Sequence, residues 1–125
     1  MPVTWSISHN DRLVLASAEG DISPGNFDEY MSALVAAGAM PYRKLFDVTY
    51  ATPGSIRLAQ LKAFGSKVVA FAKLGAVGPL AIVVGSELEH ELAELFARAD
   101  AGRALAIFSD RTKAREWLDG LAVDK

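Results

Sequence analysis

Two kinds of hydrophobic periodicity alternate along this chain. In short segments the apolar residues occupy every second position or run continuously, which is typical of β-strands; in longer segments they recur about every three to four positions, which is typical of amphipathic helices. Turn and cap residues separate these segments. The pattern predicts strands over Val3–Ser8, Arg12–Ala18, Arg43–Tyr50, Leu80–Val84 and Ala104–Phe108.

Each of the four expected helices has a recognisable start. Two of them begin with an N-cap residue followed by proline, which suits the first helical position. The third begins with the capping-box spacing Ser86-x-x-Glu89, and the fourth follows a Ser-Asp cap. The helices are expected from Pro24 to a stop near Gly38, over Pro53–Leu74, from Ser86, and from Ser109.

The predicted order of elements is therefore β-β-α-β-α-β-α-β-α. Strands that alternate with helices of this length imply β-α-β crossovers, so we expect an α/β fold with a mixed, mostly parallel five-stranded sheet. The first two strands form a hairpin, which places the first strand antiparallel at or near an edge. Since no internal repeat, linker or low-complexity tract interrupts the pattern, residues 1–125 are expected to form a single domain.

Composition narrows the classes of function. The 125 residues include no cysteine and two histidines, which excludes thiolate chemistry and leaves little material for a metal site. A net charge of −2 argues against a nucleic-acid binder. No signal peptide is visible, and no apolar run reaches the roughly 20 residues that a membrane span needs. We expect a cytoplasmic protein with no metal and no cofactor.

No complete catalytic set is present. The nucleotide-binding glycine fingerprint and the GxxxxGK[ST] loop are both absent, and Ser86 lacks the second glycine of a hydrolase nucleophile turn. The acidic residues around His90 lie near a helix start, where the helix dipole favours them, and are expected to face solvent. The protein is therefore expected to be no enzyme, with no catalytic residues.

Asp47 departs from the pattern because it lies within a strand that the topology places centrally. A buried carboxylate must find hydrogen-bond donors or it destabilises the fold. In the structural interpretation it accepts from a loop or a helix N-terminus. In the functional interpretation Asp47, Thr49, Thr52 and Ser55 form a polar mouth at the carboxyl end of the sheet, where open α/β sheets tend to bind ligands.

The helix expected over Pro53–Leu74 has a broad apolar face. This face is wider than the narrow apolar stripe that packing against a core requires, because it also includes Phe64, Phe71 and Leu74. An apolar pocket beneath this helix is therefore one hypothesis. A larger core or a homodimer interface explains the same residues equally well.

Several segments together resemble the SpoIIAA-like (STAS-like) family of small bacterial proteins. They are the hairpin, Gly20-Asp-Ile-Ser-Pro at a helix start, Lys44-Leu-Phe-Asp47, and the closing run from Ala104 to Leu118 with its Ala-x-x-Trp-Leu helix face. The similarity extends over about Arg12 to Leu118 and consists mostly of apolar pattern.

The resemblance implies a cytoplasmic module that binds a protein partner or a small ligand. Anti-sigma factor antagonists of this fold carry a phosphorylatable serine after the third strand, in an Asp-Ser-Ser-Gly-like context. This chain has Ala51-Thr-Pro-Gly-Ser55 there, so Thr52 or Ser55 matches by position while the acid and the serine pair are missing. The uncharacterised SpoIIAA-like proteins match better. Their fold has been likened to Sec14-type lipid carriers, so a carrier of a small apolar or lipid-like molecule is the alternative.

Overall fold

Within the described part of the chain, five strands form one sheet in the order in which they occur in the sequence, β1-β2-β3-β4-β5. β1 pairs with β2 antiparallel, and β2 to β5 run parallel to one another. The predicted mixed sheet with an antiparallel first strand at the edge is confirmed. The strands are β1 (Val3–Ser8), β2 (Leu13–Gly20), β3 (Arg43–Ala51), β4 (Leu80–Val83) and β5 (Leu105–Phe108).

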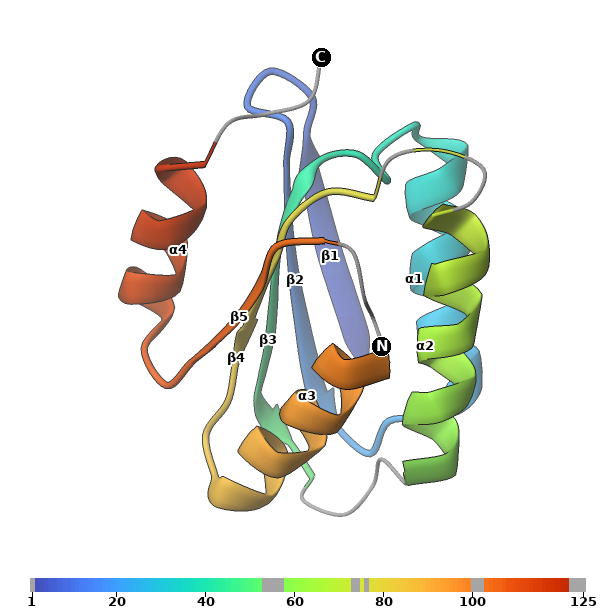
Figure 1. The fold of residues 1–125 in the computed structure, drawn as a ribbon, viewed down its shortest axis with the longest axis vertical. Coiled ribbons are helices and arrows are strands. Elements are labelled where there is room, and N and C mark those ends of the chain that lie inside the picture. The colour runs from blue at the N-terminus through green and yellow to red at the C-terminus, as the bar shows by residue number, and fades with distance from the viewer. Residues whose placement is uncertain (1, 53–57, 73–74, 76, 100–102, 122–125) are drawn as a thin grey trace.

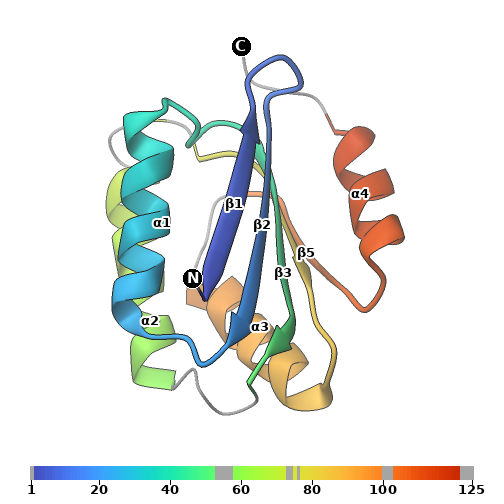
Figure 2. The ribbon, with the colours of Figure 1, turned by 180° about the vertical axis from the view of Figure 1, so that it is seen from behind.

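Four helices cover the sheet unequally. The computed structural model describes residues 2–52, 58–72, 75, 77–99 and 103–121. Figures 1 and 2 show three helices on one face of the sheet and the fourth alone on the other. Right-handed crossovers between successive neighbouring strands always place their helices on the same side, which accounts for the three. The helices are α1 (Pro24–Ala36), α2 (Leu58–Ala72), α3 (Glu87–Ala99) and α4 (Arg111–Asp119).

The predicted helix boundaries agree with local geometry at several ends. The Asp110 side chain accepts hydrogen bonds from the Thr112 and Lys113 amides, which caps α4. Gly38 follows α1 with a φ of +68°, a left-handed conformation that glycine adopts without strain. For the predicted helix over residues 53–74, positions 53–57 and 73–74 lie outside the described residues.

Several predicted strand ends differ from the structure by one or two residues, and the start of β2 shows a local cause. Arg12 was expected to begin the second strand, but it has a φ of +51° and belongs to the turn before β2. A left-handed residue cannot continue the extended ladder, so β2 begins at Leu13.

Strand alternation divides the buried apolar residues into two clusters. The larger cluster lies between the sheet and α1, α2 and α3, and it includes Val14, Phe46 and Ile82 from three neighbouring strands. The smaller one lies under α4 and includes Leu45 and Ala81 from the opposite face of two of these strands. Residues one apart along a strand point to opposite faces, so each central strand contributes to both clusters.

The turn before β4 passes very close to the turn before β3, and this contact yields a prediction. A Cβ added at Gly78 would lie 2.2 Å from the Tyr42 carbonyl oxygen and 2.3 Å from that of Pro41, both backbone atoms that cannot rotate away. We expect Gly78→Ala to lower the free energy of unfolding by about 2–4 kcal/mol, measured by urea denaturation. Gly75→Ala is the matched control because nothing lies within 4 Å of its added Cβ. Equal midpoints for the two variants would contradict the close approach.

Candidate functional site

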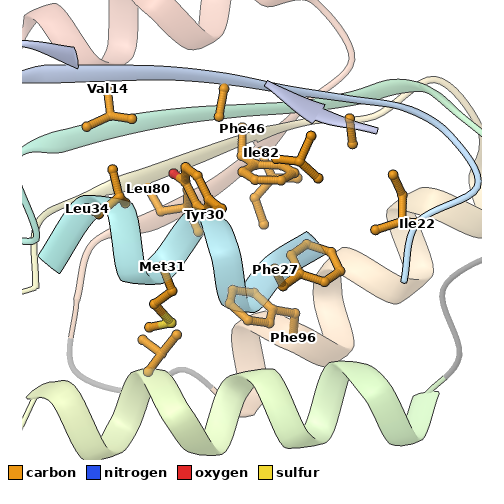
Figure 3. Close-up of a cluster of buried hydrophobic side chains, with 14 of the residues drawn as sticks. Val14, Ile22, Phe27, Tyr30, Met31, Leu34, Phe46, Leu80, Ile82 and Phe96 are labelled. Atoms are coloured by element: carbon orange, nitrogen blue, oxygen red, sulfur yellow. The ribbon is translucent and has the colours of Figure 1, made fainter. Parts of the chain in front are cut away.

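A pocket of about 110 Å³ lies between the sheet and the three helices on its larger face. Aromatic and aliphatic side chains make up most of its lining, and Figure 3 shows several of them converging from α1, α3 and the sheet. Ala51 and Ala93 also line the pocket, and these small side chains help to leave the space open. The pocket therefore belongs to the larger core cluster. Its main lining residues are Phe27, Tyr30, Phe46, Val68, Ile82 and Phe96.

Three charged side chains also line the pocket, at opposite ends of β4. Lys44 pairs with Leu80 across β3 and β4, at the first residue of β4, and Arg103 precedes β5 at the same edge. Glu89 lies beyond the last residue of β4, in the first turn of α3. A four-residue strand spans about 13 Å. The pocket thus has a basic end and an acidic end.

The two deeply buried charged residues of the pocket lining, Lys44 and Glu89, bind backbone groups. The Lys44 ammonium, 3% exposed, donates to the carbonyls of Met40 at 2.5 Å and Tyr42 at 2.8 Å. Glu89, 7% exposed, accepts from the Gly85 amide at 2.6 Å through Oε1. These bonds offset much of the desolvation cost of burying a charge.

Glu89 corrects an expectation about the acidic helix. It was expected to face solvent with its acidic neighbours, whereas the structure buries it against the sheet. The capping spacing explains the difference: the Glu89 amide donates to Ser86 Oγ at 3.2 Å, and the carboxylate turns back to the amide that precedes the cap. Glu87, Glu91 and Glu94 are exposed as expected.

The Tyr30 hydroxyl is a buried polar group without a hydrogen-bond partner among the residues that the structure describes. Tyr30 is 5% exposed and lines the pocket. The centroid of its ring lies 5.6 Å from that of Trp5 and 5.3 Å from that of Phe46. In Figure 3 its oxygen lies on the side of Leu80. Burial raises the pKa of this phenol, and the positive charge of Arg103 lowers it only in part, so the hydroxyl stays protonated at neutral pH.

The structure does not bring the described residues of the predicted polar mouth, Asp47, Thr49 and Thr52, to one face of the sheet. Asp47 lies on the β3 face that α4 covers and accepts a hydrogen bond from the Thr49 amide, while Thr52 lines the pocket on the other face. Between Asp47 and Tyr50, β3 carries one residue more than the matching stretch of β2. Such a bulge reverses the alternation of side chains, so Ala51 joins the larger core cluster. Ser55 lies outside the described residues.

Both carboxylate oxygens of Asp47 have donors. Oδ1 accepts from the Thr49 amide at 2.9 Å, and Oδ2 accepts from the Arg111 guanidinium at 3.1 Å. Arg111 is the first residue of α4, so the ion pair fastens this helix to the central strand.

The residues predicted to form an apolar pocket are less fully described. Phe64 and Phe71 fall within α2, but the positions of their side chains are outside what the structure describes, and Leu74 is outside the described residues. Val68 of the same helix does line the pocket. The residues that sequence reasoning missed are Tyr30, Lys44 and Arg103. Lys44 had a usable signal, because it lies two positions before the buried Phe46 on the same strand.

The described residues contain no group of three or more metal-binding side chains. No helix in the described part of the chain has both the length and the apolar character that crossing a membrane requires.

Comparisons with known proteins support the fold. No family model matches the chain, and comparison with curated proteins gives no match. Among solved structures, the chain is similar to an uncharacterized protein of the DUF3478 family from Shewanella loihica PV-4, which has a SpoIIAA-like fold. The TM-score is 0.62 at 18% sequence identity, and the match covers 93% of this chain and 91% of that one. This chain has a SpoIIAA-like fold. The resemblance predicted from the sequence is therefore confirmed at the level of the fold.

The Asp47–Arg111 ion pair provides a test of how α4 is held in this SpoIIAA-like fold. The carboxylate is 9% exposed and the guanidinium 49%, so solvent screens the pair only in part. We expect a double-mutant cycle of Asp47→Asn and Arg111→Gln to give a coupling energy of about 1 kcal/mol in urea denaturation. Asparagine retains the acceptor for the Thr49 amide, so the cycle isolates the ion pair.

The matched control is the exposed Arg115–Asp119 pair within α4, whose nitrogen–oxygen distance is also 3.1 Å. Exposed helical pairs of this spacing contribute about 0.3–0.5 kcal/mol. If the two cycles gave the same coupling, the pair between α4 and β3 would have no special role.

Proposed function

We propose that this protein is a binding module rather than an enzyme, and that it binds a small, largely apolar ligand in the pocket between the sheet and α1, α2 and α3. The observation that carries the proposal is a hollow of about 110 Å³ in the larger core cluster. Protein interiors are normally packed as densely as organic crystals. An unfilled apolar hollow leaves its lining side chains without packing partners on one side, which lowers stability. A ligand that fills it would recover that stability.

The polar groups of the pocket favour binding over catalysis. Lys44 and Glu89 each hold backbone groups, which fixes their geometry for a structural purpose. The Tyr30 hydroxyl remains protonated, so it is a hydrogen-bond donor and a poor base. This arrangement suits the recognition of a ligand, in which an apolar wall supplies affinity and a few polar groups set orientation.

The size of the pocket favours a small molecule over a lipid. An apolar cavity of about 150 Å³ is known to bind benzene, and drug-sized ligands occupy about 300–1,000 Å³. The volume of about 110 Å³ therefore suits a ligand of about one ring. A long acyl chain would require the helices to move away from the sheet, so the lipid-carrier alternative fits less well.

A neutral apolar probe tests the proposal directly. We expect benzene to shift the methyl NMR signals of Val48, Val68 and Ile82, which line the pocket. Signals of the α4-side cluster, such as those of Leu45 and Leu118, should stay in place. The variant Ala93→Leu should abolish the shifts because its longer side chain extends into the free space. It should not lower the urea midpoint, since filling a void stabilises.

The matched control is Ala63→Leu, at an exposed position of α2, which should retain the shifts. Should Ala93→Leu destabilise the fold, Ala51→Val fills the same pocket from the strand side. The proposal would be overturned by the absence of benzene shifts at the pocket, or by shifts that persist in a stable pocket-filled variant.

A further inference from the structure

The pocket has a polar end whose chemistry indicates what kind of ligand fits there. Resting on the proposed function, we propose that the ligand is a small apolar monocarboxylate, with its carboxylate at the Tyr30–Arg103–Lys44 end and its apolar body among the aromatic side chains. The group that requires a partner is the Tyr30 hydroxyl, which is 5% exposed and has no hydrogen bond to any described residue. A buried hydroxyl in that state is destabilising, and a ligand acceptor would satisfy it.

The positions of the three polar groups support a common subsite. The Tyr30 oxygen lies on the side of Leu80 (Figure 3). Lys44 is the register partner of Leu80 on β3. Arg103 precedes Ala104, whose carbonyl accepts from the Leu80 amide on the other side. The first residue of β4 thus marks the place where these side chains, from α1, β3 and the segment before β5, approach the pocket.

Charge selects an anionic acceptor over a neutral or cationic one. Arg103 lies close enough to Tyr30 for its positive charge to act on the phenol, and Arg103 Nη1 reaches the Gly78 carbonyl at 3.3 Å. A phenol hydroxyl and a guanidinium that line the same end of a pocket offer donors in different directions, which suits the two oxygens of a carboxylate. A ligand cation would meet like charge in a partly desolvated site.

The opposite end of the pocket limits the ligand to one acidic group. Glu89 lies there with its carboxylate turned to the Gly85 amide, so a second ligand carboxylate would meet a buried negative charge. The space between the two ends is lined by Phe46, Ile82 and Phe96 and has room for about one ring. The combination of one acidic group and one apolar body follows from these two limits.

The experiment compares benzoate with benzamide, which have nearly the same shape and differ in charge. We expect methyl NMR titration to show benzoate binding in the pocket at least about tenfold more tightly than benzamide, since hydrogen bonds to charged groups contribute more than neutral ones. Arg103→Gln should remove this preference. The exposed Arg98→Gln on α3, with the same change of charge outside the pocket, should retain it.

Tyr30→Phe gives a second readout that a purely structural role would not produce. Removing an unsatisfied hydroxyl should leave the urea midpoint of the ligand-free protein unchanged or higher, while benzoate binding weakens by about tenfold. A lower midpoint for Tyr30→Phe would show that water already satisfies the hydroxyl and would overturn the assignment of this group.

The possible failures are distinguishable. If benzene binds but benzoate binds no better than benzamide, the carboxylate assignment is wrong and the apolar binding pocket stands. The same holds if benzene binds and neither benzoate nor benzamide does. If benzene also fails to bind, the proposed function fails together with the inference.

Discussion

The alternation of side chains along β3 divides the chemistry of this protein between the two faces of its sheet. Leu45 and Asp47 point toward α4, whereas Lys44 and Phe46 point toward the three other helices. Every charged group that β3 buries must find its partners on its own side. Asp47 therefore depends on Arg111 of α4, and Lys44 depends on the carbonyls of Met40 and Tyr42. The face of β3 that bears Asp47 is thus engaged in fastening a helix, while the other face borders the pocket.

The sequential strand order makes these two faces unequal. Because each crossover joins neighbouring strands and runs in the same direction, α1, α2 and α3 all cover one face, and among the described elements the nine-residue α4 alone covers the other. Strand order does not reverse anywhere in this sheet, so the crevice that such a reversal opens at the carboxyl ends of the strands does not arise. The hollow lies instead beneath the helices, where three helices must pack on a narrow sheet.

The sequence was sufficient to predict the fold because its signals are local. Proline after a cap residue, the Ser-x-x-Glu box and the two periodicities placed all nine elements in order, and the resemblance to SpoIIAA-like proteins is borne out by the structural match. The site was not predictable in the same way. Asp47 faces α4 and Thr52, just after β3, lines the pocket, and the hydrophobic pattern does not record the face that a polar residue takes. The helical pattern predicts Tyr30 only as a core residue of α1. Arg103 follows α3 in a segment that has no hydrophobic periodicity to assign it a role.

Glu89 shows why spacing alone can mislead about a charged residue. Its position three residues after Ser86 predicted a cap correctly, and helix periodicity alone had suggested a solvated acidic face. The capping interaction turns the Glu89 carboxylate back toward the end of β4, where it accepts from the Gly85 amide. The pocket beneath the three helices reaches this point, so Glu89 becomes part of its lining. Lys44 and Arg103 lie at the other end of β4, so the two ends of the pocket carry charges of opposite sign. No single segment of the sequence predicts this arrangement. A neutral apolar hollow would accept a ligand in either orientation, whereas one with charges of opposite sign at its ends favours a single orientation.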